Sequence, residues 1–111
     1  MSARSPITTH VLDVAKGKPA AGVGVRLERV TDGGLAPLAA GETDADGRVS
    51  TLLPADHALE PGVYRITFDV GAYQVGFYPS VAIDFTVAAT DEHYHVPLLL
   101  SPYGYSTYRG S

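Results

Sequence analysis

Histidines are the residues of this chain best suited to proton transfer near neutral pH, and there are 4 of them. His93 and His95 stand close together in the segment HYHVPLLL. Alternate residues of a strand point to the same side, so we expect both imidazoles to share one face. His10 lies in THVLDV, another segment of strand character, whereas His57 lies in PADHALEPG, which is typical of a solvated surface loop.

A pair of imidazoles on one strand could instead bind a metal ion such as zinc. A third ligand would have to come from His10 or from a carboxylate, and the sequence offers neither at a spacing typical of a metal site. The chain has no cysteine, which excludes a disulfide, a thiolate zinc site and a cysteine nucleophile. We therefore predict that the chain uses neither a metal nor another cofactor.

The acidic stretch ETDADG, residues 42–47, is similar to the opening of a calcium-binding EF-hand loop. Leu53 stands at the twelfth position, where such a loop needs a glutamate, so we do not expect a calcium site. Asp46-Gly47 is the strongest hairpin signal of the chain, because glycine tolerates a positive φ. Arg48 follows this turn directly, and by itself it could be an exposed charge at a strand edge.

Strands must position these side chains, because apolar and polar residues alternate along most of the chain. The segment VYRITFDV, residues 63–70, shows the alternation most clearly. Strands are predicted over 7–14, 23–30, 38–43, 48–53, 63–70, 81–87, 93–100 and 103–108. Only GAYQVG, residues 71–76, could form a helical turn. Short strands separated by Gly, Pro and Asp predict an all-β, antiparallel sandwich.

Composition narrows the possible partners. The 111 residues suffice for one domain, and the net charge of −4 comes without any cluster of Lys and Arg. We therefore expect neither nucleic-acid binding nor attachment to an acidic membrane. The start MSARSPITTH lacks the apolar run of a signal peptide and no segment is long enough to span a membrane, so we expect a cytoplasmic protein. Composition and periodicity alone favour a binding or structural module over an enzyme.

Three segments carry a resemblance to a known family. THVLDVAKGKPAAGV, TDADGRV and HYHVPLLLSPYGYSTYRGS follow one another in this order and span nearly the whole chain. Together they resemble the 5-hydroxyisourate hydrolases, the transthyretin-like proteins of purine degradation. The most specific parts are the final YRGS, HVLD and HYHVPLLLSP. The segment DVGAYQVGFYP is several residues shorter than its usual counterpart, which includes a short helix.

The resemblance implies a fold, an assembly and a site. The fold would be a transthyretin-like sandwich of two four-stranded sheets with at most one short helical turn, formed by residues 1–111 as a single domain. The assembly would be a homotetramer with active sites in the channel between paired dimers. The family's catalytic residues fall on His10, Arg48 and His95, and its substrate-binding tail falls on Tyr108, Arg109, Gly110 and Ser111.

The implied reaction is the hydrolysis of 5-hydroxyisourate to 2-oxo-4-hydroxy-4-carboxy-5-ureidoimidazoline in urate degradation. His10 and His95 would activate water and shuttle its proton, and Arg48 would bind the oxyanion. Ser111 could orient a histidine or the substrate through its hydroxyl and its terminal carboxylate. Water would attack directly, without a covalent intermediate. The alternative is a transthyretin-like carrier of small ligands, although transthyretin itself has replaced these histidines, this arginine and this tail.

Overall fold

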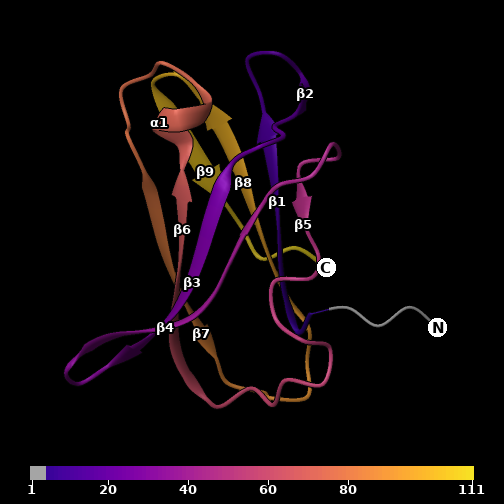
Figure 1. The fold of residues 1–111 in the computed structure, drawn as a ribbon, viewed down its shortest axis with the longest axis vertical. Coiled ribbons are helices and arrows are strands. Elements are labelled where there is room, and N and C mark those ends of the chain that lie inside the picture. The colour runs from indigo at the N-terminus through magenta and orange to yellow at the C-terminus, as the bar shows by residue number, and fades with distance from the viewer. Residues whose placement is uncertain (1–4) are drawn as a thin grey trace.

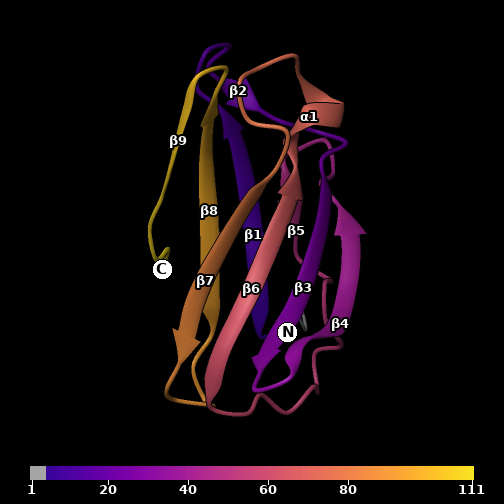
Figure 2. The same cartoon turned by 90° about the vertical axis from the view of Figure 1, so that its left-hand side faces the viewer.

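The computed structural model describes residues 5–111, which form two β-sheets packed face to face (Figures 1 and 2). The first sheet contains β1 (Ile7–Asp13), β2 (Lys18–Pro19), β5 (Arg48–Val49), β8 (Tyr94–Ser101) and β9 (Gly104–Thr107). The second contains β3 (Gly24–Thr31), β4 (Gly34–Glu42), β6 (Gly62–Asp69) and β7 (Val81–Val87). The predicted all-β sandwich is confirmed. The first sheet has five strands because residues 18–19 fold back onto β1.

The core lies between the two sheets and follows the predicted alternation. On β6, Tyr64, Ile66 and Phe68 are at most 2% exposed, while the residues between them face outward. On β8, Leu98 and Leu100 are fully buried. Burying each such side chain contributes about 1.5–3 kcal/mol before entropy is counted. This core holds the outer faces of both sheets at fixed positions.

The prediction of a purely antiparallel sandwich is wrong at one pair of strands. β1 runs parallel to β8, with Ile7 opposite Tyr94 and Asp13 opposite Leu100. A parallel pair needs a long connection. Here the whole of the second sheet, together with β2 and β5, lies between these two strands in the sequence. Segments from the two ends of the chain therefore become neighbours at the centre of the first sheet.

The prediction of a hairpin at Asp46-Gly47 is also wrong. Gly47 has the expected positive φ of 74°. However, the strands on either side belong to different sheets, since β4 pairs with β3 and β5 pairs with β1. The turn thus carries the chain from one layer of the sandwich to the other.

The strand predicted over 48–53 ends at Val49. Beyond Val49, the backbone N–H of Leu53 donates to Ser5 Oγ at 3.0 Å instead of to a neighbouring strand. Leu52 and Leu53 are 6% and 3% exposed and join the core. Burial of two consecutive leucines is incompatible with a strand that turns every second side chain outward.

The single helix described, α1 (Val70–Tyr73), is four residues long, as expected of the shortened segment. Its Tyr73 hydroxyl donates a hydrogen bond of 2.7 Å to Asp13 at the end of β1. Asp13 is 1% exposed. Burial raises the pKa of this carboxyl, but hydrogen bonds from Tyr73 and the backbone of Lys16 outweigh that effect and lower it. Across residues 5–111, no helix is long and apolar enough to cross a lipid bilayer.

Candidate active site

The candidate site lies on the outer face of the first sheet, where β1 is flanked by β5 and β8. Thr8 and His10 share this face, since Ile7, Thr9 and Val11 point into the core. The antiparallel pairing with β5 places Arg48 directly opposite His10. The parallel pairing with β8 places His95 directly opposite Thr8. Three strands from distant parts of the sequence therefore present His10, Arg48 and His95 on one surface.

The acidic turn before β5 positions Arg48. Asp44 Oδ1 accepts the backbone N–H of Asp46 at 2.9 Å and that of Arg48 at 3.0 Å. Gly47 lies so close to β1 that a Cβ there would sit 2.5 Å from the carbonyl oxygen of Val11. The acidic stretch thus closes its own turn and docks on β1.

A pocket of about 200 Å³ opens on this face. Its lining includes Arg48 and His95, together with Ser111 from the tail, and these are predicted site residues. Thr8, Thr9 and Ser50 complete the lining. His10 is outside the lining but directly opposite Arg48 in the sheet. Figure 2 shows the end of the chain lying beside β8, where Gly110 bridges His95.

The environment of His10 favours its neutral form. Its pKa is lowered, first by partial burial and second by the positive charge of Arg48. A hydrogen bond with the backbone of Asp46 and the negative charges of Asp44 and Asp46 act in the opposite sense. A neutral imidazole can accept a proton from water, which is the property that a general base needs.

The tail reaches the pocket along β8. The backbone N–H of Gly110 donates to the carbonyl of His95 at 2.9 Å, and the two residues form an isolated antiparallel bridge. This bridge places Ser111 beside His95 and Arg48.

Tyr108 and Arg109, two predicted substrate contacts, line a second hollow of about 340 Å³ between β7 and β8, and His95 contributes to the lining of both hollows. The Arg109 guanidinium lies 4.5 Å from the ring centroid of Tyr94 and pairs with Glu92 at 2.9 Å. It also donates to the backbone carbonyl of His93 at 3.3 Å. Arg109 therefore ties the tail to the beginning of β8.

Thr8 is a residue of the site that the sequence analysis missed. Its hydroxyl lies 2.9 Å from Nε2 of His93 and 2.8 Å from Nδ1 of His95. The two imidazoles therefore share one face, as predicted, and they share one partner. Thr8 precedes His10 by two positions, and strand alternation could have placed it on the same face. Its contact with β8 required knowledge of the strand pairing.

The remaining histidine, His57, lies in the loop between β5 and β6 and does not line the pocket. In the part of the chain that the structure describes, no group of three or more His, Asp or Glu side chains could hold a metal ion.

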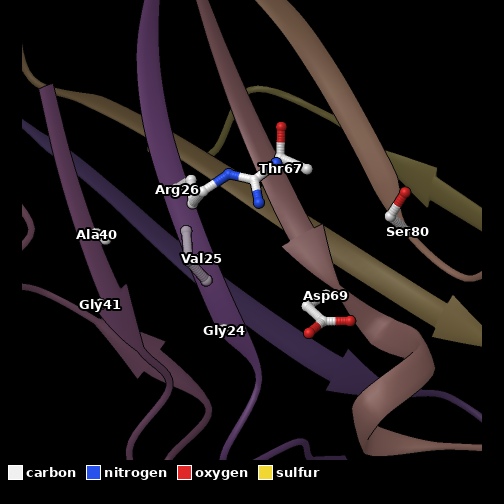
Figure 3. Close-up of a pocket in the computed structure, with 8 residues that line it drawn as sticks. All are labelled: Gly24, Val25, Arg26, Ala40, Gly41, Thr67, Asp69 and Ser80. Atoms are coloured by element: carbon white, nitrogen blue, oxygen red, sulfur yellow. The ribbon is translucent and has the colours of Figure 1, made fainter. Parts of the chain in front are cut away.

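A larger hollow of about 530 Å³ lies on the other sheet (Figure 3). The hollow is not filled by side chains at Gly24, Ala40 and Gly41, because these residues have small side chains or none. Figure 3 shows Arg26 of β3 extending toward Thr67 of β6, with Asp69 and Ser80 at the rim. None of the predicted site residues contributes to it.

The chain is similar to proteins of one known family. The family model described as "Transthyretin: HIUase/Transthyretin family" matches residues 7–110. The chain belongs to this family. A 5-hydroxyisourate hydrolase of Salmonella dublin is 49% identical over 110 residues, which cover 95% of this chain and 80% of the relative.

Two solved structures of the HIUase/transthyretin family are similar to the present one. The 5-hydroxyisourate hydrolase of Klebsiella pneumoniae has a TM-score of 0.81 and 37% identity, covering 95% of this chain and 98% of that one. Sea bream transthyretin in complex with thyroxine has a TM-score of 0.87 and 34% identity, covering 96% and 95%. Backbone shape alone therefore does not distinguish a 5-hydroxyisourate hydrolase from transthyretin.

Proposed function

We propose that this chain hydrolyses 5-hydroxyisourate to 2-oxo-4-hydroxy-4-carboxy-5-ureidoimidazoline in urate degradation. The observation that carries the proposal is the convergence of Arg48, His95 and Ser111 on one pocket, with His10 directly opposite Arg48. A proton acceptor, a permanent cation and polar tail groups within one surface are the parts that hydrolysis of a cyclic amide needs. The names of the relatives described above support the same substrate.

The proposed reaction begins with direct attack of water on a ring carbonyl of the substrate. One of the histidines His10 and His95 accepts a proton from this water as the new C–O bond forms. The resulting oxyanion collapses, the ring C–N bond breaks, and the leaving nitrogen receives the proton back. The lowered pKa of His10 favours the neutral form that accepts a proton. No protein atom bonds to the substrate, and no cofactor takes part.

Arg48 is proposed to bind the substrate oxygen that becomes negative during attack. Its planar guanidinium offers several N–H donors in a fixed arrangement, which suits the oxygens of a urate-like ring. The turn of residues 44–47 holds the backbone of Arg48 in place before the substrate arrives. A preformed donor of this kind costs little reorganisation in the transition state.

The tail is proposed to complete the pocket. Ser111 orients the substrate or a histidine, and Gly110 allows the chain to lie against His95. Tyr108 and Arg109 shape the approach, with Arg109 as the anchor to Glu92 and as a second possible substrate contact. We further propose a single domain, a cytoplasmic location and a homotetramer in which neighbouring subunits enclose this open pocket. Analytical ultracentrifugation tests the assembly.

The proposal is tested by mixing the purified protein with freshly generated 5-hydroxyisourate and following its absorbance. We expect decay much faster than in buffer. His95→Gln should slow catalysis by roughly 10²–10⁴-fold, the usual contribution of a general acid or base. His57→Gln is the matched control, because it removes an imidazole outside the site. Decay no faster than in buffer would refute the hydrolase function.

The second candidate is a carrier of small ligands, which the TM-score of 0.87 to the thyroxine complex of transthyretin favours. A carrier would bind thyroxine or a related aromatic ligand without turning over 5-hydroxyisourate. Calorimetric titration with thyroxine, combined with the absorbance assay, separates the two. Tight binding without hydrolysis would establish the carrier function instead.

A further inference from the structure

The contact between Thr8 and two histidines is a feature that the proposed mechanism does not use. Thr8 Oγ1 lies 2.9 Å from Nε2 of His93 and 2.8 Å from Nδ1 of His95. Although Thr8 is on the outer face of its sheet, it is only 5% exposed. Both distances are those of good hydrogen bonds. The hydroxyl is therefore a buried bridge between two titratable rings.

We propose that Thr8 and His93 are positioning residues that determine which ring nitrogen of His95 carries its proton. The inference rests on the proposed function in one respect only, namely that His95 handles the proton of the attacking water. The linkage between the two rings follows from the hydrogen bonds themselves, and it can be measured without substrate.

The linkage arises because a hydroxyl has a single hydrogen. When Thr8 donates to Nδ1 of His95, Nε2 of His93 must carry a hydrogen in order to donate to Oγ1. When Thr8 instead donates to Nε2 of His93, Nδ1 of His95 must be the donor. As long as the hydroxyl hydrogen is donated to one of the two neutral rings, the tautomer of one histidine thus sets the tautomer of the other.

The two arrangements give His95 opposite chemical roles at Nε2, the ring nitrogen that does not contact Thr8. In the first, His95 is protonated at Nε2 and can donate a proton. In the second, Nε2 has a lone pair and can accept one. A step that takes a proton from water therefore requires the second arrangement, with Nδ1 donating to Thr8.

The Thr8 hydroxyl also offers a path by which the proton taken from water can move its positive charge from His95 to His93. After Nε2 of His95 takes a proton from water, Nδ1 can pass its own hydrogen to Oγ1, while the Oγ1 hydrogen moves to Nε2 of His93. His95 is then neutral and protonated at Nε2, and His93 carries the positive charge. Return of the leaving group's proton reverses these transfers, so no proton is lost or gained. Both rings remain intact throughout.

Several neighbouring cations oppose a second positive charge on this pair. His10 on β1 and Arg48 on β5 lie on the same face, and Arg109 of the tail, paired with Glu92, donates to the carbonyl of His93. Ser111, with its negative terminal carboxylate, lines the pocket beside His95 and acts in the opposite sense. Two imidazolium rings joined by one hydroxyl would repel each other and these arginines. We therefore expect the pair to hold one extra proton at a time near neutral pH.

The decisive variants are Thr8→Val, which removes the hydroxyl at nearly constant volume, and Thr8→Ser, which keeps it. Ring nitrogen chemical shifts of isotope-labelled histidine, followed by NMR without substrate, report the tautomer of each ring. In the parent protein and in Thr8→Ser, we expect His93 and His95 to titrate in a coupled manner. In Thr8→Val, they should titrate independently. His93→Gln assigns the signals.

Kinetics supply the second measurement. Thr8→Val should lower kcat by about 10- to 100-fold, by analogy with loss of the hydrogen-bond partner of a metal-ligating histidine. Its kcat profile between about pH 5 and 9 should change shape, while KM changes little. Thr8→Ser should restore most of the rate. If Thr8 served only the stability of the fold, its replacement would not lower kcat while leaving KM nearly unchanged.

Thr43→Val is the control for loss of a buried hydroxyl. Thr43 is 4% exposed, donates to the carbonyl of Ala20 at 2.7 Å and accepts the backbone N–H of Val23 at 2.9 Å. This variant should lose stability but keep the kcat profile and the coupled titration. Independent titration of His93 and His95 in the parent protein, or coupled titration that survives in Thr8→Val, would overturn the proposal. If the protein does not hydrolyse 5-hydroxyisourate, the NMR result still decides the linkage.

Discussion

Gly110 lies against the edge of the His95 imidazole, where a Cβ on the glycine would sit 2.5 Å from Cδ2 and 3.2 Å from Cγ. The same glycine donates its backbone N–H to the carbonyl of His95 at 2.9 Å. A side chain at position 110 therefore cannot be added without moving the tail or the ring. A displacement of the tail at Gly110 would therefore also displace His95, the proposed catalytic histidine.

Gly110→Ala should reduce hydrolysis of 5-hydroxyisourate by roughly 10- to 100-fold, since displacement of a reacting group by about 1 Å can cost this much. The fold should persist, because the bridge involves only the end of the chain. Gly104→Ala is the matched control, since a Cβ there meets no atom within 4 Å apart from its chain neighbours. Equal activity of the two variants would contradict a role for the tail, and the absorbance assay distinguishes the outcomes.

Arg48→Gln should raise the pKa of His10. The positive charge of Arg48 lowers this pKa, and burial of the ring, which is the larger cause, remains in the variant. We therefore expect the pKa of His10 to be higher in the variant than in the parent protein. NMR titration of the His10 ring measures it. Arg26→Gln, on the other sheet, is the control and should leave the titration unchanged.

The lowered pKa of His10 also predicts how the activity of the parent protein falls at acidic pH. If neutral His10 is required, activity falls as pH drops through the lowered pKa of His10, so the midpoint lies below about 6.5. A profile of kcat/KM against pH gives the midpoint. A midpoint well above that value would mean that His10 is not the group that must be neutral.

Tyr73→Phe should destabilise the fold by about 1.5–3 kcal/mol near neutral pH, because Asp13 would lose a hydrogen bond to its buried charge. The folded-state pKa of Asp13 is lowered, so its contribution is present above the unfolded value of about 4 and is lost as pH falls through the folded value. The difference between parent and variant should therefore shrink in acid.

Chemical denaturation of both proteins at neutral pH and at about pH 3 measures this difference. Tyr103→Phe is the control, because Tyr103 is 82% exposed. A difference that is the same at both pH values would show that the Asp13 charge is not the origin of the effect.

Strand alternation was sufficient to predict much of the fold. The pattern of residues 63–70 placed Tyr64, Ile66 and Phe68 in the core, and all three are buried. Alternation also placed His93 and His95 on one face. It succeeded because one face of each strand is packed and the other is not, which leaves a period of two in the sequence.

The sequence did not predict which strands pair with one another. Nothing in the segment ITTHVLD indicates that its neighbour is HVPLLL, running parallel and beginning more than eighty residues later. The Asp46-Gly47 turn had the predicted φ but the wrong partners, because a turn motif records local backbone geometry and says nothing about which sheet each strand joins. Thr8 was missed for the same reason.

By itself, the sequence determined the class of fold, the faces of its strands and the identity of the groups that could transfer protons. These properties are local, since they depend on side-chain chemistry and on the two-residue repeat of a strand. Only the tertiary structure decided that Thr8 joins His93 to His95 and that Gly110 lies against His95. Such contacts depend on which strands pair and in what register, and core packing settles that choice over the whole chain at once.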